Sequence, residues 1–361
     1  MAKSTHTAQP PGRRRVPVWN WLVVFAVLVA AAGMGLNFVP SGQVALVPHD
    51  PLDLGGRVRI DGSRPEPVHG KVFLVGVEER KVSLLQKFLL GFDETVSFEV
   101  APTPTAREIQ DQENKQAIAT SKEIAVAVVL ELLNQPVIYT GGGARVTATV
   151  PGTPGARLLR TGDRIVRFNG EQVVTAADVT RRVGALSPGS AVSLGVRRDG
   201  QPRVVRLSTV APTGGDERIR SRIGVSVDTP DLKIRPSRDV SFKTENVGGP
   251  SAGLAFALVV YDSLSDRDVV RGRHIVATGA LTLDGTVAPV GGVREKAIAA
   301  QNAGRDLFVV PTANVDEAVR GVQLACGEGQ DCTRVLSVEN VPQAMELLSL
   351  TPSELETRLA N

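Results

Sequence analysis

The chain has 361 residues, 42% of them hydrophobic and 22% charged, which is enough to bury about two or three hydrophobic cores. Lys and Arg number 41 against 38 Asp and Glu, and the few aromatic residues are not interleaved with basic ones, so no nucleic-acid partner is expected. No Gly-x-x-x-x-Gly-Lys-Ser/Thr run occurs. The sequence therefore predicts no nucleotide site, no metal and no other cofactor.

An uncharged run from Val16 to Val39 is long enough, at about 1.5 Å per residue, to cross a hydrocarbon core of about 30 Å. Three arginines at positions 13–15 precede it. By the positive-inside rule we expect a cytoplasmic tail at 1–15, a transmembrane helix at 16–39, and the rest of the chain outside the cytoplasm. A cleaved signal peptide is the alternative, although the run is longer than the usual core of such peptides.

Three short strands and a long helix are predicted between residues 40 and 133. The strand patterns cover 43–47, 57–60 and 71–75, separated by turns with Pro, Gly or Asp. The helix covers 106–133, and its second half is strongly apolar. We expect 40–133 to form a strand-rich membrane-proximal region that ends in this helix.

The stretch 134–211 has the pattern of a small β domain. A strand is predicted at 144–150, a helix at 175–183, and a closing hairpin that turns at Asp199-Gly200. This order resembles a PDZ domain, and the resemblance implies a β-sandwich or barrel with helices. It also implies a partner, because PDZ domains bind extended peptides by adding a strand to a sheet edge.

The loop that would bind a peptide carboxylate has no clear sequence mark, since no Gly-Leu-Gly-Phe-like run is present. By its place in the order, 134–143 is the candidate loop. The predicted peptide-binding residues are then Gly142, Gly143, Ala144 and Val146. The alternative is that the glycines at 141–143 form only a flexible turn.

Ser251 lies in the run Gly249-Pro250-Ser251-Ala252-Gly253, between an extended segment and an apolar helix predicted at 252–264. A serine at a helix start is close to unpaired backbone N–H groups and to the positive end of the helix dipole. An oxyanion formed on a substrate carbonyl would find donors there, and the backbone of Ala252 is the candidate donor.

Lys296 lies on a helix predicted to begin near Val293, where it shares one face with Val293, Ala297 and Ala300. A lysine that is buried among small apolar residues has a lowered pKa, so its neutral amine can accept the proton of a serine hydroxyl. Ser251 and Lys296 are therefore the predicted catalytic dyad. The alternative is an ordinary helix lysine whose amine reaches solvent.

Gly-x-Ser-x-Gly is also the nucleophile pattern of α/β-hydrolases, which need a histidine well downstream of the serine. The only histidine after residue 69 is His274, which is followed at once by the apolar run 275–277. We expect His274 to be a strand or surface residue, so an esterase of that type is the weaker interpretation.

Four motifs resemble the proteolytic domain of Lon in order and spacing. They are 246–253 (Asn-Val-Gly-Gly-Pro-Ser-Ala-Gly), 278–285 (Thr-Gly-Ala-Leu-Thr-Leu-Asp-Gly), 290–296 (Val-Gly-Gly-Val-Arg-Glu-Lys) and 311–314 (Pro-Thr-Ala-Asn). The resemblance implies that Ser251 is the nucleophile, that Lys296 is the base, and that Thr278 helps to hold the lysine. It also implies that copies of the chain assemble as a ring. Gly249 departs from the family pattern, which has an acidic residue at this place.

The proteolytic part is predicted as a mixed α/β domain at 212–350, with strands at 223–227, 239–244, 273–281 and 306–310. The segment 211–216 is the predicted linker before it, and 351–361 is a predicted C-terminal tail. Cys326 and Cys332 bracket a short polar loop and are candidates for a disulfide in an oxidising compartment. A free buried pair is the alternative.

The whole order of parts is similar to the YlbL-like group of membrane-anchored, PDZ-containing Lon-like peptidases. The resemblance implies a bacterial cell membrane protein with its catalytic domain outside the cytoplasm. The predicted function is an ATP-independent serine endopeptidase that cleaves exposed or misfolded exported polypeptides, with the PDZ domain helping to select them. The main alternative is a non-enzymatic PDZ adaptor whose Lon-like domain is a scaffold.

Overall fold

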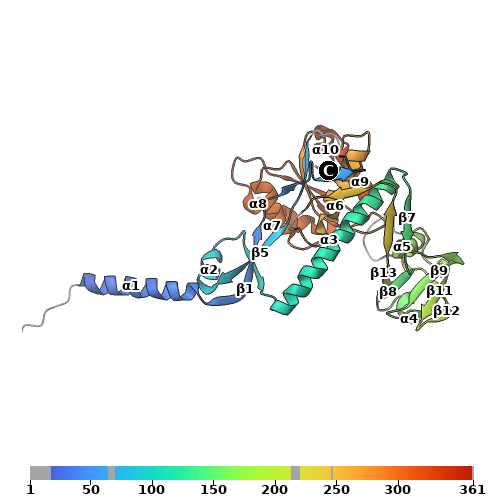
Figure 1. Ribbon diagram of the computed structural model, residues 1–361, viewed down its shortest axis with the longest axis horizontal. Helices are drawn as coiled ribbons and strands as arrows, with labels where there is room; N and C mark the ends of the chain where they lie inside the picture. The colour runs from blue at the N-terminus through green and yellow to red at the C-terminus, as the bar shows by residue number, and fades with distance from the viewer. Residues whose placement is uncertain (1–17, 64–69, 213–219, 245–246, 360–361) are drawn as a thin grey trace, which may run out of the picture. The chain divides into compact units, whose positions relative to one another are not determined.

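The computed structural model describes residues 18–63, 70–212, 220–244 and 247–359. The chain divides into two compact units, one of residues 1–46 with 79–101 and the other of 47–78 with 102–361. Figure 1 shows the elements of both units. The predicted cytoplasmic tail and most of the predicted linker at 211–216 lie outside the described residues.

The first unit contains two helices and a three-stranded sheet. Its sheet has the order β5-β1-β6, and the side chain of Ser83 caps the short helix α2 by accepting from the backbone N–H of Gln86. The elements are α1 (Val18–Asn37), β1 (Pro40–Pro48), β5 (Val77–Ser83), α2 (Leu84–Leu90) and β6 (Ser97–Val100).

The helix α1 falls within the run that was predicted to span a membrane. Among the residues that the structure describes, no helix is both long enough and apolar enough to cross one. The transmembrane helix predicted at 16–39 is therefore not confirmed.

The second unit is built on a five-stranded sheet of the order β2-β4-β16-β19-β20. Four of its strands run parallel, and β2 is antiparallel at the edge. The internal strand β19, between β16 and β20, reads Leu-Phe-Val-Val-Pro and is buried along its whole length, as expected for a parallel strand covered on both faces. The strands are β2 (Leu52–Asp53), β4 (Lys71–Leu74), β16 (His274–Ala277), β19 (Leu307–Pro311) and β20 (Arg334–Val338).

Helices cover both faces of this sheet. Alternation along β19 sends Leu307 and Val309 into one hydrophobic cluster, and Phe308 and Val310 into another. The first cluster includes α3 (Pro104–Leu132), α6 (Gly253–Leu264), α9 (Val341–Leu348) and α10 (Pro352–Leu359), and the second includes α7 (Val293–Asn302) and α8 (Val315–Ala325).

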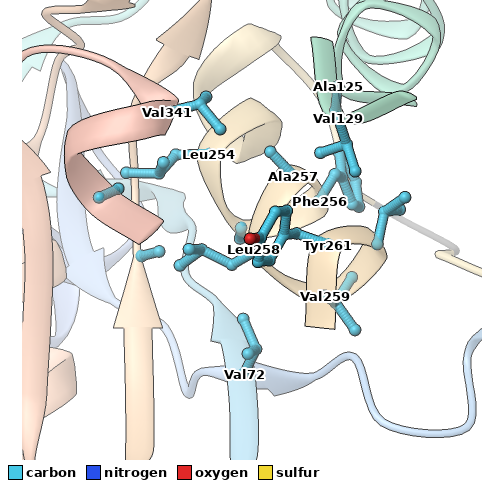
Figure 2. Packing of buried hydrophobic residues seen from close by; sticks show 14 of the residues in the cluster. Val72, Ala125, Val129, Leu254, Phe256, Ala257, Leu258, Val259, Tyr261 and Val341 are labelled. Carbon is cyan, nitrogen blue, oxygen red and sulfur yellow. The ribbon is translucent and has the colours of Figure 1, made fainter. Parts of the chain in front are cut away.

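Figure 2 shows the first cluster around α6. Phe256 is fully buried there, with Val72 of β4 and with Val129 of α3 in the same cluster. The apolar second half of α3 thus packs against α6, while its polar first half stays largely exposed.

The predicted boundaries need correction at four places. The strand predicted at 223–227 in the proteolytic domain pairs instead with residues 145–149 of the PDZ-like part, so that part does not end at 211. The strand β4 lies inside the sheet between β2 and β16, so the region 40–133 does not form a separate part. The domain predicted at 212–350 is discontinuous, because β2, β4 and α3, which precede the PDZ-like part in the sequence, belong to its sheet and core. Residues 352–359 of the predicted tail form α10 instead, which buries Leu355 to 2% exposure against the core.

The PDZ-like part is a sheet of the order β12-β11-β9-β8-β13, with β10 paired to β9. Asp199 and Gly200 have φ of 51° and 77°, which fits the two-residue turn predicted between its last two hairpin strands. Its elements are β8 (Ala144–Thr149), α4 (Pro154–Leu158), β9 (Arg164–Phe168), β10 (Glu171–Gln172), α5 (Ala176–Gly184), β11 (Ala191–Arg198), β12 (Gln201–Ser208) and β13 (Val225–Asp228).

Short ribbons and turns complete the second unit. The pairs are β3 (Val58–Ile60) with β15 (Val240–Phe242), β7 (Val137–Thr140) with β14 (Lys233–Pro236), and β17 (Ala280–Leu281) with β18 (Val287–Ala288). The 3₁₀ turns are η1 (Pro250–Ala252) and η2 (Thr312–Asn314).

Candidate active site

Ser251 lies in the turn η1, directly before α6, which places it at a helix start as the sequence predicts. Gly249 has a φ of 80° and so makes the sharp entry that a residue with a side chain would adopt only under strain. The helix α3 holds this entry from the side: the N–H of Gly249 donates to the carbonyl of Asn114 (2.9 Å), and Ser121 Oγ donates to the carbonyl of Pro250 (3.1 Å).

The carbonyl of Ser251 is fixed by the turn that follows β16. It accepts from the N–H of Gly279 at 2.8 Å and from Thr278 Oγ1 at 3.2 Å. The N–H of Leu254 donates in turn to the carbonyl of Gly279 at 3.0 Å. These bonds tie the first turn of α6 to the end of β16. Ala252 is the last residue of η1, next to Ser251, and its role as an oxyanion donor stays a prediction.

Lys296 is 4% exposed and lies on α7, with Val293 and Ala297 of the same face at 0% exposure. Its Nζ donates to Thr278 Oγ1 at 3.3 Å and to the carbonyl of Gly291 at 3.0 Å. The inward orientation that the helix spacing predicts is therefore observed, and the surface alternative does not hold.

Burial lowers the pKa of Lys296 from 10.5 to about 8, because the charged ammonium is removed from water. Glu317 and Glu295 act in the opposite direction and favour the charged form. Both carboxylates have other hydrogen-bond partners: Glu317 accepts from the N–H of Val293 at 3.1 Å, and Glu295 accepts from Arg294 at 3.0 Å. Desolvation is thus the largest influence on this amine.

Thr278 joins the two predicted catalytic residues. Its hydroxyl is fully buried, accepts from Lys296 Nζ and donates to the carbonyl of Ser251. Among the described residues, Ser251 Oγ and Lys296 Nζ share no direct hydrogen bond, and Thr278 connects Lys296 Nζ to the backbone carbonyl of Ser251. Thr278 therefore contacts the lysine, as the Lon resemblance implies.

Two residues that sequence reasoning did not assign position the loop before α7. Asn314 clamps Val290 with two bonds, accepting from its N–H at 3.0 Å and donating to its carbonyl at 3.1 Å. Glu317 accepts from the first N–H groups of α7 and so stabilises the start of the helix that carries Lys296. The motif at 311–314 marked Asn314 only as part of a resemblance, and no local pattern marked Glu317.

His274 does not belong to this site. It is the first residue of β16, its side chain is 45% exposed, and its Nδ1 lies 3.4 Å from Asp306 Oδ2. Thr278 follows the other end of the strand, about 13 Å away at about 3.3 Å per residue. The elbow-type esterase therefore lacks its histidine near Ser251.

The predicted peptide-binding residues of the PDZ-like part are not at a free edge, and this prediction is corrected. The strand β8 is paired on one side with β9 and on the other with β13. The N–H of Gly142 donates to Pro230 (2.8 Å) and that of Gly143 to Val174 (3.2 Å), while Ala144 and Val146 are buried in the core. The N–H groups of the two glycines and the side chains of Ala144 and Val146 are therefore already engaged within the domain.

The strands β12 and β13 form the two edges of this sheet, and β13 is the edge next to β8. The loop that leads into it is tied to the end of α5, because Ser221 Oγ donates to the carbonyl of Val183 at 2.7 Å. Among described residues, the N–H groups of Ile223 and Gly224 have no acceptor. Gly224 has a φ of 78° and packs against Thr153 where a Cβ would clash.

Cys326 and Cys332 form a disulfide that closes the loop between them, as predicted. Within the described ranges no group of His, Cys, Asp or Glu side chains could hold a metal ion.

Two families match parts of this chain. Residues 245–346 match the Lon protease (S16) C-terminal proteolytic domain, and residues 112–209 match the PDZ domain. A Lon protease of Roseiflexus castenholzii is 44% identical over 69 residues, covering 19% of this chain and 8% of the relative. A Lon protease of Helicobacter pylori (strain J99) is 35% identical over 98 residues, covering 27% of this chain and 11% of the relative. The chain thus spans about a tenth of the length of these relatives.

Among solved structures, the PDZ domain of the SdrC-like protein from Listeria monocytogenes is similar to part of this chain, with 18% sequence identity and a TM-score of 0.22. The match covers 24% of this chain and 90% of that structure. The family matches show that the chain combines a Lon-type proteolytic domain with a PDZ domain.

The lowered pKa of Lys296 predicts a stability difference with a definite pH dependence. The folded pKa of about 8 lies below the unfolded value of 10.5, so burial costs about 3 kcal/mol below pH 8. This cost disappears as the pH rises from 8 to 10.5, where the amine is neutral in both states. Lys296→Met removes the cost but also removes two hydrogen bonds of about 1 kcal/mol each.

We therefore expect Lys296→Met to be about 1 kcal/mol more stable than the wild type at pH 7, and to lose this advantage by pH 10. Urea denaturation of both proteins at the two pH values measures the difference. A difference that is the same at pH 7 and pH 10 would show that the amine keeps its ordinary pKa.

Proposed function

We propose that this chain is an ATP-independent serine endopeptidase in which Ser251 is the nucleophile and Lys296 the general base. The observation that carries the proposal is the state of the Lys296 amine. It is buried, its pKa is lowered to about 8, and it is linked through Thr278 to the backbone of Ser251. A nucleophile beside a base that is itself oriented by a third group is the general pattern of activated serines.

The hydrogen bonds of Lys296 suit a neutral amine. A neutral amine has two N–H donors and one lone pair, and the two observed acceptors are Thr278 Oγ1 and the Gly291 carbonyl. With both N–H groups held, the lone pair remains to accept a proton. A charged ammonium in the same place would have a third N–H without an acceptor, which adds to the cost of its burial.

In the proposed reaction, Lys296 removes the hydroxyl proton of Ser251 while Ser251 Oγ attacks the scissile carbonyl carbon. The resulting oxyanion is stabilised by N–H groups at the start of α6, with Ala252 as the predicted donor. Lys296 then gives its proton to the leaving amine as the C–N bond breaks, which leaves an ester on Ser251. Water, deprotonated by Lys296, hydrolyses this ester and restores both residues.

The peptide-binding edge that we propose for the PDZ domain is β13, with the loop at 222–224. A peptide adding to β13 would extend the sheet at its edge. The unpaired N–H groups of Ile223 and Gly224, at the start of that strand, are donors that suit a terminal carboxylate. This replaces Gly142 and Gly143 as the carboxylate loop.

We further propose that the chain is anchored to a bacterial membrane by residues 16–39 and acts on exported polypeptides. The support is the uncharged run with its preceding arginines. Large apolar side chains of α1 are also exposed, among them Trp19 at 72% and Phe25 at 67%. A disulfide between Cys326 and Cys332 fits an oxidising compartment.

Ser251→Ala should lose peptidase activity by at least about 10³-fold while keeping its thermal stability, because it removes one hydroxyl and no core contact. Cleavage of an unfolded protein without ATP measures this. Ser263→Ala is the matched control, since Ser263 lies on the same helix and its hydroxyl donates to the carbonyl of Val259 one turn earlier. Equal cleavage by the wild type and Ser251→Ala would favour the adaptor alternative or a contaminating protease.

Amidating the C-terminal carboxylate of a substrate tests whether β13 and the loop at 222–224 bind that carboxylate. For a long unfolded substrate with its recognition sequence at the C-terminus, amidation should raise KM roughly tenfold, the value of one charge-assisted contact, with little change in kcat. A short peptide that spans only the active site serves as the control and should not respond. An equal KM for the free and amidated long substrates would exclude carboxylate recognition.

A further inference from the structure

A groove with a volume of about 390 Å³ lies beside the nucleophile turn, between α3, η1 and β17. Its volume falls in the range of about 300–1,000 Å³ that is typical of ligand sites. One wall is Pro250, the residue directly before Ser251, and another is Leu281, two residues after Gly279. The N–H of Gly279 donates to the carbonyl of Ser251. The walls formed by Pro250 and Leu281 therefore belong to the two backbone segments that hold the nucleophile in place.

The third wall is α3, which lies outside the residues that match the Lon domain. Ala117, Thr120 and Ile124 line the groove at spacings of three and four residues, so they share one helix face. Ser121, on the same face, is 3% exposed and holds the Pro250 carbonyl. The distance between α3 and the nucleophile turn is therefore fixed by a hydrogen bond.

The lining has a clear chemical character. Four of the lining side chains are apolar, those of Ala117, Ile124, Pro250 and Leu281, and three are polar without a charge, those of Gln116, Thr120 and Ser121. The one charged residue of the lining is Glu113, next to Asn114, whose carbonyl accepts from the N–H of Gly249. A groove with these apolar walls and one carboxylate suits an apolar side chain and disfavours an acidic one.

We propose that this groove binds the side chain of a substrate residue next to the scissile bond, that it selects an apolar side chain such as Leu or Phe, and that α3 sets this selectivity. The inference rests on the proposed function, because it assigns the groove to the substrate of the same Ser251. The helix α3 thus also shapes the cleavage preference.

Ala117→Phe is the variant that fills the groove, and Ala119→Phe is its matched control. Ala119→Phe makes the same change on the same helix, but residue 119 is exposed and does not line the groove. The full chain is given short amidated peptides that differ only at the residue before a single cleavage site, which is Leu, Phe, Ala or Asp. Mass spectrometry confirms the site of cleavage.

The wild type and Ala119→Phe should prefer the Leu and Phe peptides to the Ala peptide in kcat/KM by roughly 10- to 100-fold, the effect of burying one large apolar side chain. Ala117→Phe should reduce that ratio at least tenfold. Equal use of all four peptides by the wild type would overturn the proposal. So would a ratio in Ala117→Phe that equals that of Ala119→Phe.

Measuring peptide binding without cleavage tests the groove proposal separately from the proposed catalytic function. In a Ser251→Ala background the Leu peptide should bind at least about tenfold more tightly than the Asp peptide, and adding Ala117→Phe should abolish the difference, as measured by fluorescence anisotropy. If selective binding is present but no peptide is cleaved, the proposed function fails and the groove stands. If cleavage depends on Ser251 but neither binding nor cleavage responds to Ala117→Phe, the groove proposal alone fails.

Discussion

The burial of one amine, Lys296 Nζ, is the constraint on which the rest of the site depends. Burying an ammonium to 4% exposure costs free energy, and the pKa of the amine is therefore lowered to about 8. Two fixed acceptors hold the amine in place. Thr278 Oγ1 and the Gly291 carbonyl then define where the lone pair points. Desolvation thus brings the pKa of this amine close to neutral pH, as the proposed general base requires.

The scaffold around α7 keeps this amine in place. Val293, Ala297 and Ala300 pack one side of the helix against the sheet. On another side α8 approaches so closely at Gly321 that a Cβ there would lie 2.4 Å from the Arg294 carbonyl. Glu317 of α8 stabilises the first turn of α7. Small residues at the α7 and α8 contact therefore allow the close packing that excludes water from Lys296.

Local sequence patterns predicted the elements that carry the dyad but not how distant segments pair. The glycine and proline before Ser251 predicted a turn into a helix, and the three-and-four spacing around Lys296 predicted its burial. The run at 71–75 was predicted as a strand, yet nothing in it shows that it lies beside β16, because pairing is a property of the whole fold. For the same reason α3 was not expected to contact Pro250, and β13 was not expected at the edge of the PDZ sheet.

The most direct test of this account is the pKa of Lys296 itself. Lysine labelled at Cε and Nζ can be titrated by NMR in the full chain, with the Lys296→Met spectrum assigning the signal. One lysine should titrate near pH 8 and be missing from the spectrum of the variant. A Lys296 signal that titrates near 10.5, as a solvated lysine does, would rule out the proposed role of this amine.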